Sequence, residues 1–419
     1  MTQYDDFEQS LASIGEEADN PYQRLFGLKF NPFPQVPVVT TAPTFCYNQI
    51  ELKENILQYI RNTIAGQKAA IILKGEIGDG KTHLLRYFEN IITEKLSEIV
   101  KDGFRTGIGF FVDDPGNGMQ DIFRKFMEWQ KREFWDILGC DILKHRLNAP
   151  EHVVLYLRGA KSRLLEEEIK EVKSELPEWV QIYESYLYQQ TMNWNIAKAF
   201  AGLINNLDED YQFRQMLCWN FLTAGKISAT DARKLGFSTN QIADIEIVDY
   251  FAGVLNIIGT MYRGIFIFID ELENVTQMHR TTKHKTYIGF TKLLNVMPQN
   301  VMLTFGCDTE AVEWIKNEDI ALARRFTGEL LIHGAQNEQN AREYLTKYLA
   351  QARPDAETGD ELSPFTEESF RVLYDTLRTL PLGLSTGEFL KYCGRALEQA
   401  LKENKSEIDV EIIQQITSF

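Results

Sequence analysis

A glycine-rich loop between a buried strand and a helix constrains this chain more than any other feature of its sequence. The strand is predicted over residues 69–73, which are all apolar, and the helix is predicted from Lys81 onward. The loop between them fits the pattern GxxxxGK[ST] and reads Gly75-Glu76-Ile77-Gly78-Asp79-Gly80-Lys81-Thr82. Such a loop wraps its backbone N–H groups around phosphate, and the following helix adds the positive end of its dipole. The alternative is a glycine turn at the surface, which the strand before it and the helix after it disfavour.

The residues of this loop have distinct expected roles. Lys81 is expected to reach the β- and γ-phosphates of ATP, and the Thr82 hydroxyl is expected to bind Mg²⁺. Contacts with the nucleotide are expected from Gly75, Glu76, Ile77, Gly78, Asp79, Gly80, Lys81, Thr82 and His83. The sequence therefore predicts ATP and Mg²⁺ as ligands.

A second buried strand ends in two carboxylates. Residues 265–269 are apolar, and Asp270 and Glu271 follow directly, at the strand end where α/β sheets bind ligands. Asp270 is expected in the Mg²⁺ shell, and Glu271 is expected to polarise the attacking water as a catalytic residue. The alternative is an ordinary strand followed by an acidic helix cap. Glu273 and Asn274 are expected either to support the site or to cap that helix, and capping is favoured.

Strand and helix signals alternate in two separate parts of the chain, which predicts a parallel α/β sheet. Between Thr82 and Ile265 lie 182 residues (264 minus 82), mostly in amphipathic helical patterns, and an insertion of this length is a domain rather than a loop. The predicted organisation is an arm over 1–48, sheet over 49–116 and 241–335, a helical insertion over 117–240, and a helical lid over 336–419.

The arm carries the string FGLKFNPFP at residues 26–34. Its prolines exclude a helix or a central strand. Its aromatic residues are expected to pin an extended segment onto the domain that follows.

The net charge and the distribution of apolar residues limit the kinds of function that this protein can have. A net charge of −16 excludes a protein that coats nucleic acid with its whole surface, so DNA contact is expected only from a local patch or a partner. The acidic, polar start is unlike a signal peptide, and no apolar run approaches the roughly 20 residues of a membrane span, so we expect a cytoplasmic protein without membrane contact. The five cysteines form no CxxC pair, which favours free thiols.

The order of arm, glycine loop, acidic strand end and helical tail resembles that of AAA+ P-loop ATPases, in particular the origin-recognition and Cdc6-like branch. The resemblance implies a five-stranded parallel sheet with a C-terminal helical lid. The strand VMLTFGCD looks like the one that carries sensor 1, with Thr304, Cys307 or Asp308 as its polar residue.

The string ALARRF is similar to the arginine-finger box of initiator-type AAA+ proteins. It implies that Arg325, with Arg324 as second choice, acts on the γ-phosphate of a neighbouring subunit in a homo-oligomer. The alternative is a solvated basic pair at a helix end. The branch usually carries a sensor 2 arginine where this chain reads Gly383-Leu384-Ser385-Thr386-Gly387-Glu388, so hydrolysis is expected to be slow or dependent on a partner.

Residues 219–273 resemble the ATP-binding proteins of BREX-type bacterial defence systems, whereas the string FGLKFNPF resembles AAA+ proteins of the secretion and transposition-regulator group. The first resemblance implies an ATPase that controls assembly on DNA or on partner proteins of an antiphage defence system. The alternatives are a transposition-type or other DNA-targeting regulator, and a slowly hydrolysing, nucleotide-bound adaptor.

One basic stretch stands out against the acidic background, between His279 and Lys285. Its basic residues are His279, Arg280, Lys283, His284 and Lys285. In ring-forming relatives this region faces the central channel, so contact with a phosphate backbone is one expectation. A solvated loop is the other.

Overall fold

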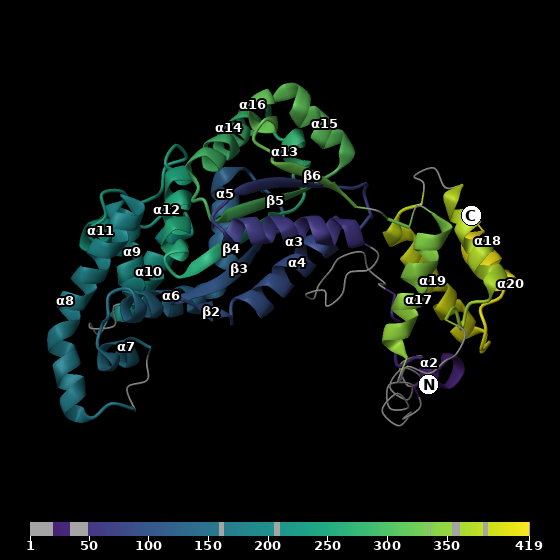
Figure 1. Cartoon of the computed structure of the whole chain (residues 1–419), viewed down its shortest axis with the longest axis horizontal. Helices are drawn as coiled ribbons and strands as arrows, with labels where there is room; N and C mark the ends of the chain where they lie inside the picture. The colour runs from purple at the N-terminus through teal and green to yellow at the C-terminus, as the bar shows by residue number, and fades with distance from the viewer. Residues whose placement is uncertain are drawn as a thin grey trace, which may run out of the picture.

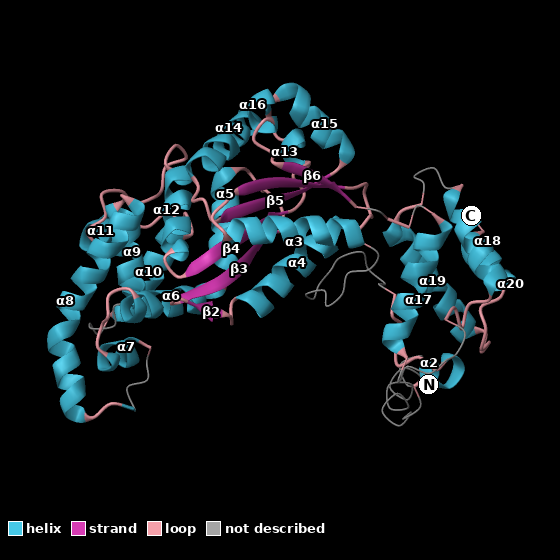
Figure 2. Ribbon diagram, in the orientation of Figure 1, coloured by secondary structure: helices cyan, strands magenta, loops and turns pink. Residues whose placement is uncertain are grey.

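The structure is a computed structural model in which helices surround one sheet (Figures 1 and 2). It describes residues 20–33, 49–158, 163–204, 210–332, 334–335, 337–353, 361–379 and 384–418. Among the helices of these residues, none is long and apolar enough to cross a membrane.

The sheet has the strand order β2-β3-β4-β5-β1-β6. Its strands are β1 (Ala69–Lys74), β2 (Val100–Lys101), β3 (Phe104–Val112), β4 (Tyr262–Ile269), β5 (Val301–Cys307) and β6 (Gly328–Leu331). All neighbours are parallel except β2 and β3, so the predicted five-stranded parallel sheet is present and β2 adds a short sixth strand. The added hairpin turns at Asp102-Gly103, where both residues have positive φ, as two-residue hairpin turns require.

The two faces of the sheet bury different helices. One face packs α3 (Ile50–Ile64) and α4 (Lys81–Leu96) against alternate strand residues such as Ile71 and Phe268. On the opposite face, the strand residues that alternate with these, such as Ile72 and Ile267, are buried. They lie under α5 (Met119–Trp129), α12 (Ile247–Gly259) and α14 (Arg280–Val296). This alternation explains why the central strands are apolar along their whole length.

The insertion lies at the end of the sheet away from the lid (Figure 1). Its helices include α6 (Lys131–His145), α7 (Glu151–Leu157), α8 (Glu166–Thr191), α9 (Trp194–Ile204), α10 (Tyr211–Leu222) and α11 (Ala229–Lys234). Most of their buried side chains share one cluster with a face of the sheet, while Val153, Tyr156, Val172 and Leu176 of α7 and α8 form a small separate cluster.

The lid forms a separate hydrophobic cluster and includes the start of the chain. It contains α2 (Pro21–Phe26), α17 (Glu338–Ala352), α18 (Glu367–Arg378), α19 (Thr386–Lys402) and α20 (Val410–Thr417). Phe33 stacks on Tyr348 with ring centroids 5.9 Å apart, and Phe26 and Leu28 are buried beside them.

The expectation that the arm packs on the domain that follows it is therefore wrong for residues 20–33. The apolar side of α3, the first helix of that domain, is already occupied by the sheet. The lid helices instead offer the apolar surface that these aromatic residues cover. Residues 1–19 and 34–48 of the arm lie outside the described residues.

Candidate nucleotide-binding site

The glycine loop connects β1 to α4 at the carboxyl end of the sheet. Gly78 and Gly80 have φ values of 87° and 94°, which side-chain-bearing residues rarely adopt. Gly80 is the N-cap of α4, so the loop ends at the positive end of that helix. These two glycines thus allow the tight turn that the motif predicts.

Lys81 points back into the loop from the first turn of α4. Its Nζ donates to the carbonyl oxygens of Gly75 at 3.0 Å and Glu76 at 3.3 Å, and only 8% of the residue is exposed. The Glu273 carboxylate lies 4.0 Å from the same nitrogen. The ammonium group is thus held at the loop, in reach of any phosphate bound there.

Asp79 stabilises the loop from within. Its carboxylate accepts the Glu76 backbone N–H at 2.9 Å, and burial raises its pKa. Ile77, by contrast, is 81% exposed at the crest of the loop. Asp79 is one of the residues predicted to contact the nucleotide. Its side chain is instead directed into the loop, where its carboxylate holds the Glu76 backbone N–H.

Asp270 meets the loop from the end of β4. The Thr82 side chain lies beside its carboxylate, the residue is 2% exposed, and burial raises its pKa. Its Oδ1 has no hydrogen-bond partner among the described residues. A Cβ on Gly306 of β5 would lie 2.5 Å from that oxygen, so the glycine leaves room for it.

This donor set fits Mg²⁺. The ion prefers hard oxygen ligands from one or two carboxylates and keeps other positions for water and phosphate. Thr82 and Asp270 would hold it, through a hydroxyl oxygen and a buried carboxylate oxygen that lacks another partner.

Glu271 has an unusual backbone conformation. Its φ is 51°, in the left-handed region that non-glycine residues seldom occupy and that is concentrated at functional sites. The side chain is exposed, unlike that of Asp270, and its Oε2 accepts a hydrogen bond from Asn274 Nδ2 at 2.8 Å. The two carboxylates therefore differ in environment, one buried against Thr82 and the other open to solvent.

Glu273 belongs to the site, and the expectation that it caps the next helix is wrong. It precedes α13 (Asn274–Gln277) but makes no side-chain capping hydrogen bond. Its carboxylate instead faces Lys81, Asp270 and Asp308, and burial raises its pKa. The alternative prediction, that Glu273 supports the site, agrees with this position, and its signal is a third acidic residue within four positions of the strand end.

The three candidates for sensor 1 occupy different places on and after β5. Thr304 is buried within the strand, opposite Ile71 and well before the loop. Cys307 ends the strand opposite Lys74, and Asp308 caps α15 (Thr309–Glu318) by accepting the Ala311 N–H at 2.6 Å. Only Cys307 and Asp308 therefore reach the edge of the sheet that carries the loop.

The two arginines lie at the opposite edge of the sheet. They follow α16 (Ile320–Ala323) and precede β6, and the nearby Thr327 N–H donates to the Ala70 carbonyl at the start of β1. Five residue steps of extended strand, roughly 16 Å, lead from Ala70 to Gly75 at the start of the loop. Arg325 therefore cannot reach the phosphate loop of its own chain.

The lid touches the glycine loop through the first turn of α19. The Gly387 N–H donates to the Gly78 carbonyl at 2.8 Å, and Ser385 caps the helix by accepting the Glu388 N–H at 3.2 Å. Gly383 lies outside the described residues. At residues 384–388 the contact is thus made by backbone and hydroxyl groups where the related branch has an arginine.

The basic stretch is helical, which corrects the expectation of a loop. α14 begins at Arg280, and His279 is its N-cap residue. Arg280, His284 and Lys285 are exposed and make no hydrogen bond or ion pair with other described residues, whereas Lys283 lies 4.3 Å from the Trp314 ring centroid. Four basic residues at the positive end of a helix are unfavourable for helix stability.

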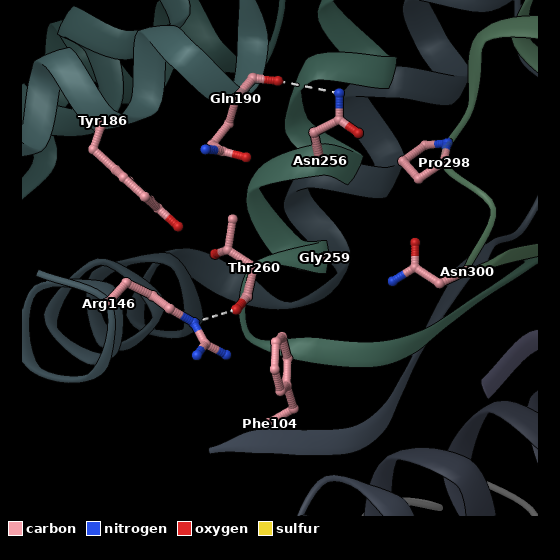
Figure 3. A pocket seen from close by; sticks show the side chains of 9 residues that line it. All are labelled: Phe104, Arg146, Tyr186, Gln190, Asn256, Gly259, Thr260, Pro298 and Asn300. Atoms are coloured by element: carbon pink, nitrogen blue, oxygen red, sulfur yellow. Dashed lines mark hydrogen bonds between the residues drawn. The ribbon is translucent and has the colours of Figure 1, made fainter. Parts of the chain in front are cut away.

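A cavity of about 380 Å³ lies far from the loop, where α8 and α12 meet the starts of β3 and β5 (Figure 3). Arg146 points toward the Thr260 carbonyl, to which its Nε donates at 2.6 Å, and its guanidinium lies 3.9 Å from the Phe104 ring centroid. This arginine joins the insertion to the core, and the cavity is separate from the nucleotide site.

The mostly parallel α/β sheet, glycine loop, acidic strand end, helical insertion and C-terminal helical lid agree with the fold class that the sequence predicts. Residues 159–313 match the family model described as "BREX system ATP-binding protein BrxC/D". The predicted resemblance to these proteins is therefore confirmed over that part of the chain. A search of curated proteins gives no match.

Comparison with solved structures gives matches that cover most of this chain. The Orc1 protein of Aeropyrum pernix in complex with DNA has 10% identity and a TM-score of 0.46, with 91% of this chain and 67% of that chain covered. The ORC2 protein of the same organism, solved as ADPNP–ADP complexes, has 10% identity, a TM-score of 0.43 and coverages of 92% and 71%. Cdc6p of Pyrobaculum aerophilum has 9% identity, a TM-score of 0.43 and coverages of 91% and 69%.

We expect Gly306→Ala to weaken Mg²⁺-dependent ATP binding about 10- to 100-fold, because its Cβ would displace the Asp270 carboxylate. Calorimetric titration with ATP at several Mg²⁺ concentrations measures the effect. Gly264→Ala is the matched control, because its Cβ would crowd Phe266 in the same sheet away from the site. Unchanged Mg²⁺ dependence in Gly306→Ala would contradict the assignment of Asp270.

Proposed function

We propose that this protein is a cytoplasmic AAA+ ATPase that binds and hydrolyses ATP with Mg²⁺ and controls assembly on DNA or on partner proteins. We further propose that it serves a BREX-type antiphage defence system. The observation that carries the proposal is the meeting of Lys81, Thr82, Asp270 and Glu271 at one sheet edge. These residues come from segments 190 positions apart (271 minus 81).

The contacts support a different role for each residue of the site. Lys81 and the loop backbone bind the β- and γ-phosphates, while Thr82 and Asp270 hold Mg²⁺, which neutralises phosphate charge when it is bound. Glu271, exposed and oriented by Asn274, accepts a proton from the attacking water. Glu273 keeps the Lys81 ammonium directed at the loop.

A second candidate function is a nucleotide-bound adaptor that scarcely turns over. It is favoured by the contact between α19 and the loop, where Gly387 and Ser385 stand in place of a sensor 2 arginine. A transposition-type or other DNA-targeting regulator is a further alternative, and it would use the same ATP site with different partners.

Glu271→Gln separates the ATPase from the adaptor. The amide keeps the shape of the side chain but cannot accept a proton, so turnover should fall roughly 10²-fold or more while ATP affinity is retained. Lys81→Ala should lose ATP binding itself. Steady-state ATPase rates and fluorescent-nucleotide binding measure both variants, and a wild-type rate equal to that of Glu271→Gln would favour the adaptor.

Arg325 tests whether the active form is an oligomer. The distance between Arg325 and its own loop supports action on a neighbouring subunit. Arg325→Ala should bind ATP normally and hydrolyse it poorly, and mixing it with Lys81→Ala should restore activity at interfaces that combine an intact loop with an intact arginine. ATPase per subunit should also rise with protein concentration. Activity that is independent of concentration, without rescue in any mixture, would identify a monomeric enzyme.

The start of α14 is the proposed contact for a nucleic-acid backbone. Arg280 and Lys285 project their charges into solvent, beside the exposed His284, in a protein whose net charge is −16. Since these charges oppose the helix dipole, a bound anion would relieve an unfavourable arrangement. This proposal would place DNA near the nucleotide site, because only the short α13 separates α14 from the acidic strand end.

The double variant Arg280→Gln/Lys285→Gln should weaken binding of a short DNA duplex and reduce the slope of log K against log salt by about 2. Fluorescence anisotropy over a salt series gives both values. Arg233→Gln/Lys234→Gln on α11 is the matched control, since it removes the same charge from exposed positions of the insertion. Equal losses in the two double variants would argue against a local DNA contact.

A further inference from the structure

We propose that Asn295 is a positioning residue that fixes the guanidinium group of Arg325 for action on a neighbouring subunit. This inference rests on the proposed role of Arg325 and adds to it a second residue, from another helix. Asn295 lies in the last turn of α14, and its Oδ1 accepts a hydrogen bond from Arg325 Nε at 2.8 Å.

The end of α14 is itself held in place. Lys68 Nζ donates to the carbonyl oxygens of Leu294 at 3.0 Å and Asn295 at 3.1 Å. These are carbonyls at a helix end, which lack intrahelical partners. Because Lys68 directly precedes β1, the position of Asn295 is tied to the strand that leads to the glycine loop.

Arg325 is held from a second side as well. Its Nη1 donates to the Ala321 carbonyl in α16 at 2.7 Å. A guanidinium group has five N–H donors, so these two contacts leave three for a phosphate, enough for a bidentate bond. Arg324, in contrast, is exposed and has no partner among the described residues, so its side chain would lose more conformational freedom on binding.

The two contacts serve to orient the Arg325 side chain more than to stabilise the fold. Arg325 is only half-buried, and polar contacts between partly exposed side chains contribute little to the free energy of unfolding. What two fixed contacts do provide is a single direction for a long side chain. Positioning of this kind affects the rate of a reaction without affecting nucleotide affinity.

Mixing experiments with the full chain isolate this role. In a mixture of Arg325→Ala with Lys81→Ala, the Lys81→Ala subunit has a dead loop and supplies only the arginine. The double variant Lys81→Ala/Asn295→Ala supplies an arginine without its Asn295 contact, so it should rescue Arg325→Ala at least 5-fold less well than Lys81→Ala does. Lys81→Ala/Lys292→Ala is the matched control on the same helix and should rescue fully.

Single-chain kinetics provide the second readout. Asn295→Ala should lower kcat with unchanged KM and unchanged ATP affinity, and Asn295→Ala/Arg325→Ala should lose no more kcat than Arg325→Ala alone. Thermal unfolding of each variant checks that the fold is retained. If Lys81→Ala/Asn295→Ala rescues as well as Lys81→Ala, the role of Asn295 is overturned while that of Arg325 stands. If Lys81→Ala itself gives no rescue, both roles are overturned.

Discussion

The meeting of Thr82 and Asp270 is the constraint on which the rest of the site depends. It brings the first turn of α4 to the end of β4, two elements that the insertion separates in sequence. The two residues meet because β1, β5 and β4 are parallel neighbours whose carboxyl ends lie at one edge. A buried carboxylate is destabilising unless it accepts a hydrogen bond or binds a cation. The unpartnered oxygen of Asp270 faces the space that Gly306 leaves open, and this space is suited to a cation.

The sequence was sufficient for the sheet and the glycine loop, because apolar strands and a fixed motif are local signals. It was insufficient where a choice between surfaces decides the outcome. The aromatic residues of the arm indicate burial but not whether Phe33 meets the core or the lid. The helix at Arg280 was missed because its first turn carries basic residues where acidic ones are favoured. Glu273 was assigned by position to a cap, although burial beside Lys81 decides its role.

The two ends of the sheet serve different purposes. The carboxyl ends of the strands gather the glycine loop, the acidic residues and the first turn of α19. The opposite ends carry the arginine pair and the insertion, which shares a hydrophobic cluster with the sheet. α14 extends from one end to the other, with the basic stretch at its start and Asn295 in its last turn. α14 therefore connects the basic stretch to the residue that contacts Arg325.

The hydrophobic core of the lid combines segments that lie far apart in the sequence, and this affects the order of folding during biosynthesis. Phe33 is buried in the same cluster as Ala335, 302 positions later (335 minus 33). At a translation rate of about 5–20 residues per second, the first segment waits roughly 15–60 s on the ribosome before its packing surface emerges. During that interval Phe26, Leu28 and Phe33 are exposed to water and to chaperones. The residues of the nucleotide core all precede Ala335 in the sequence, so the core can fold before the lid cluster is complete.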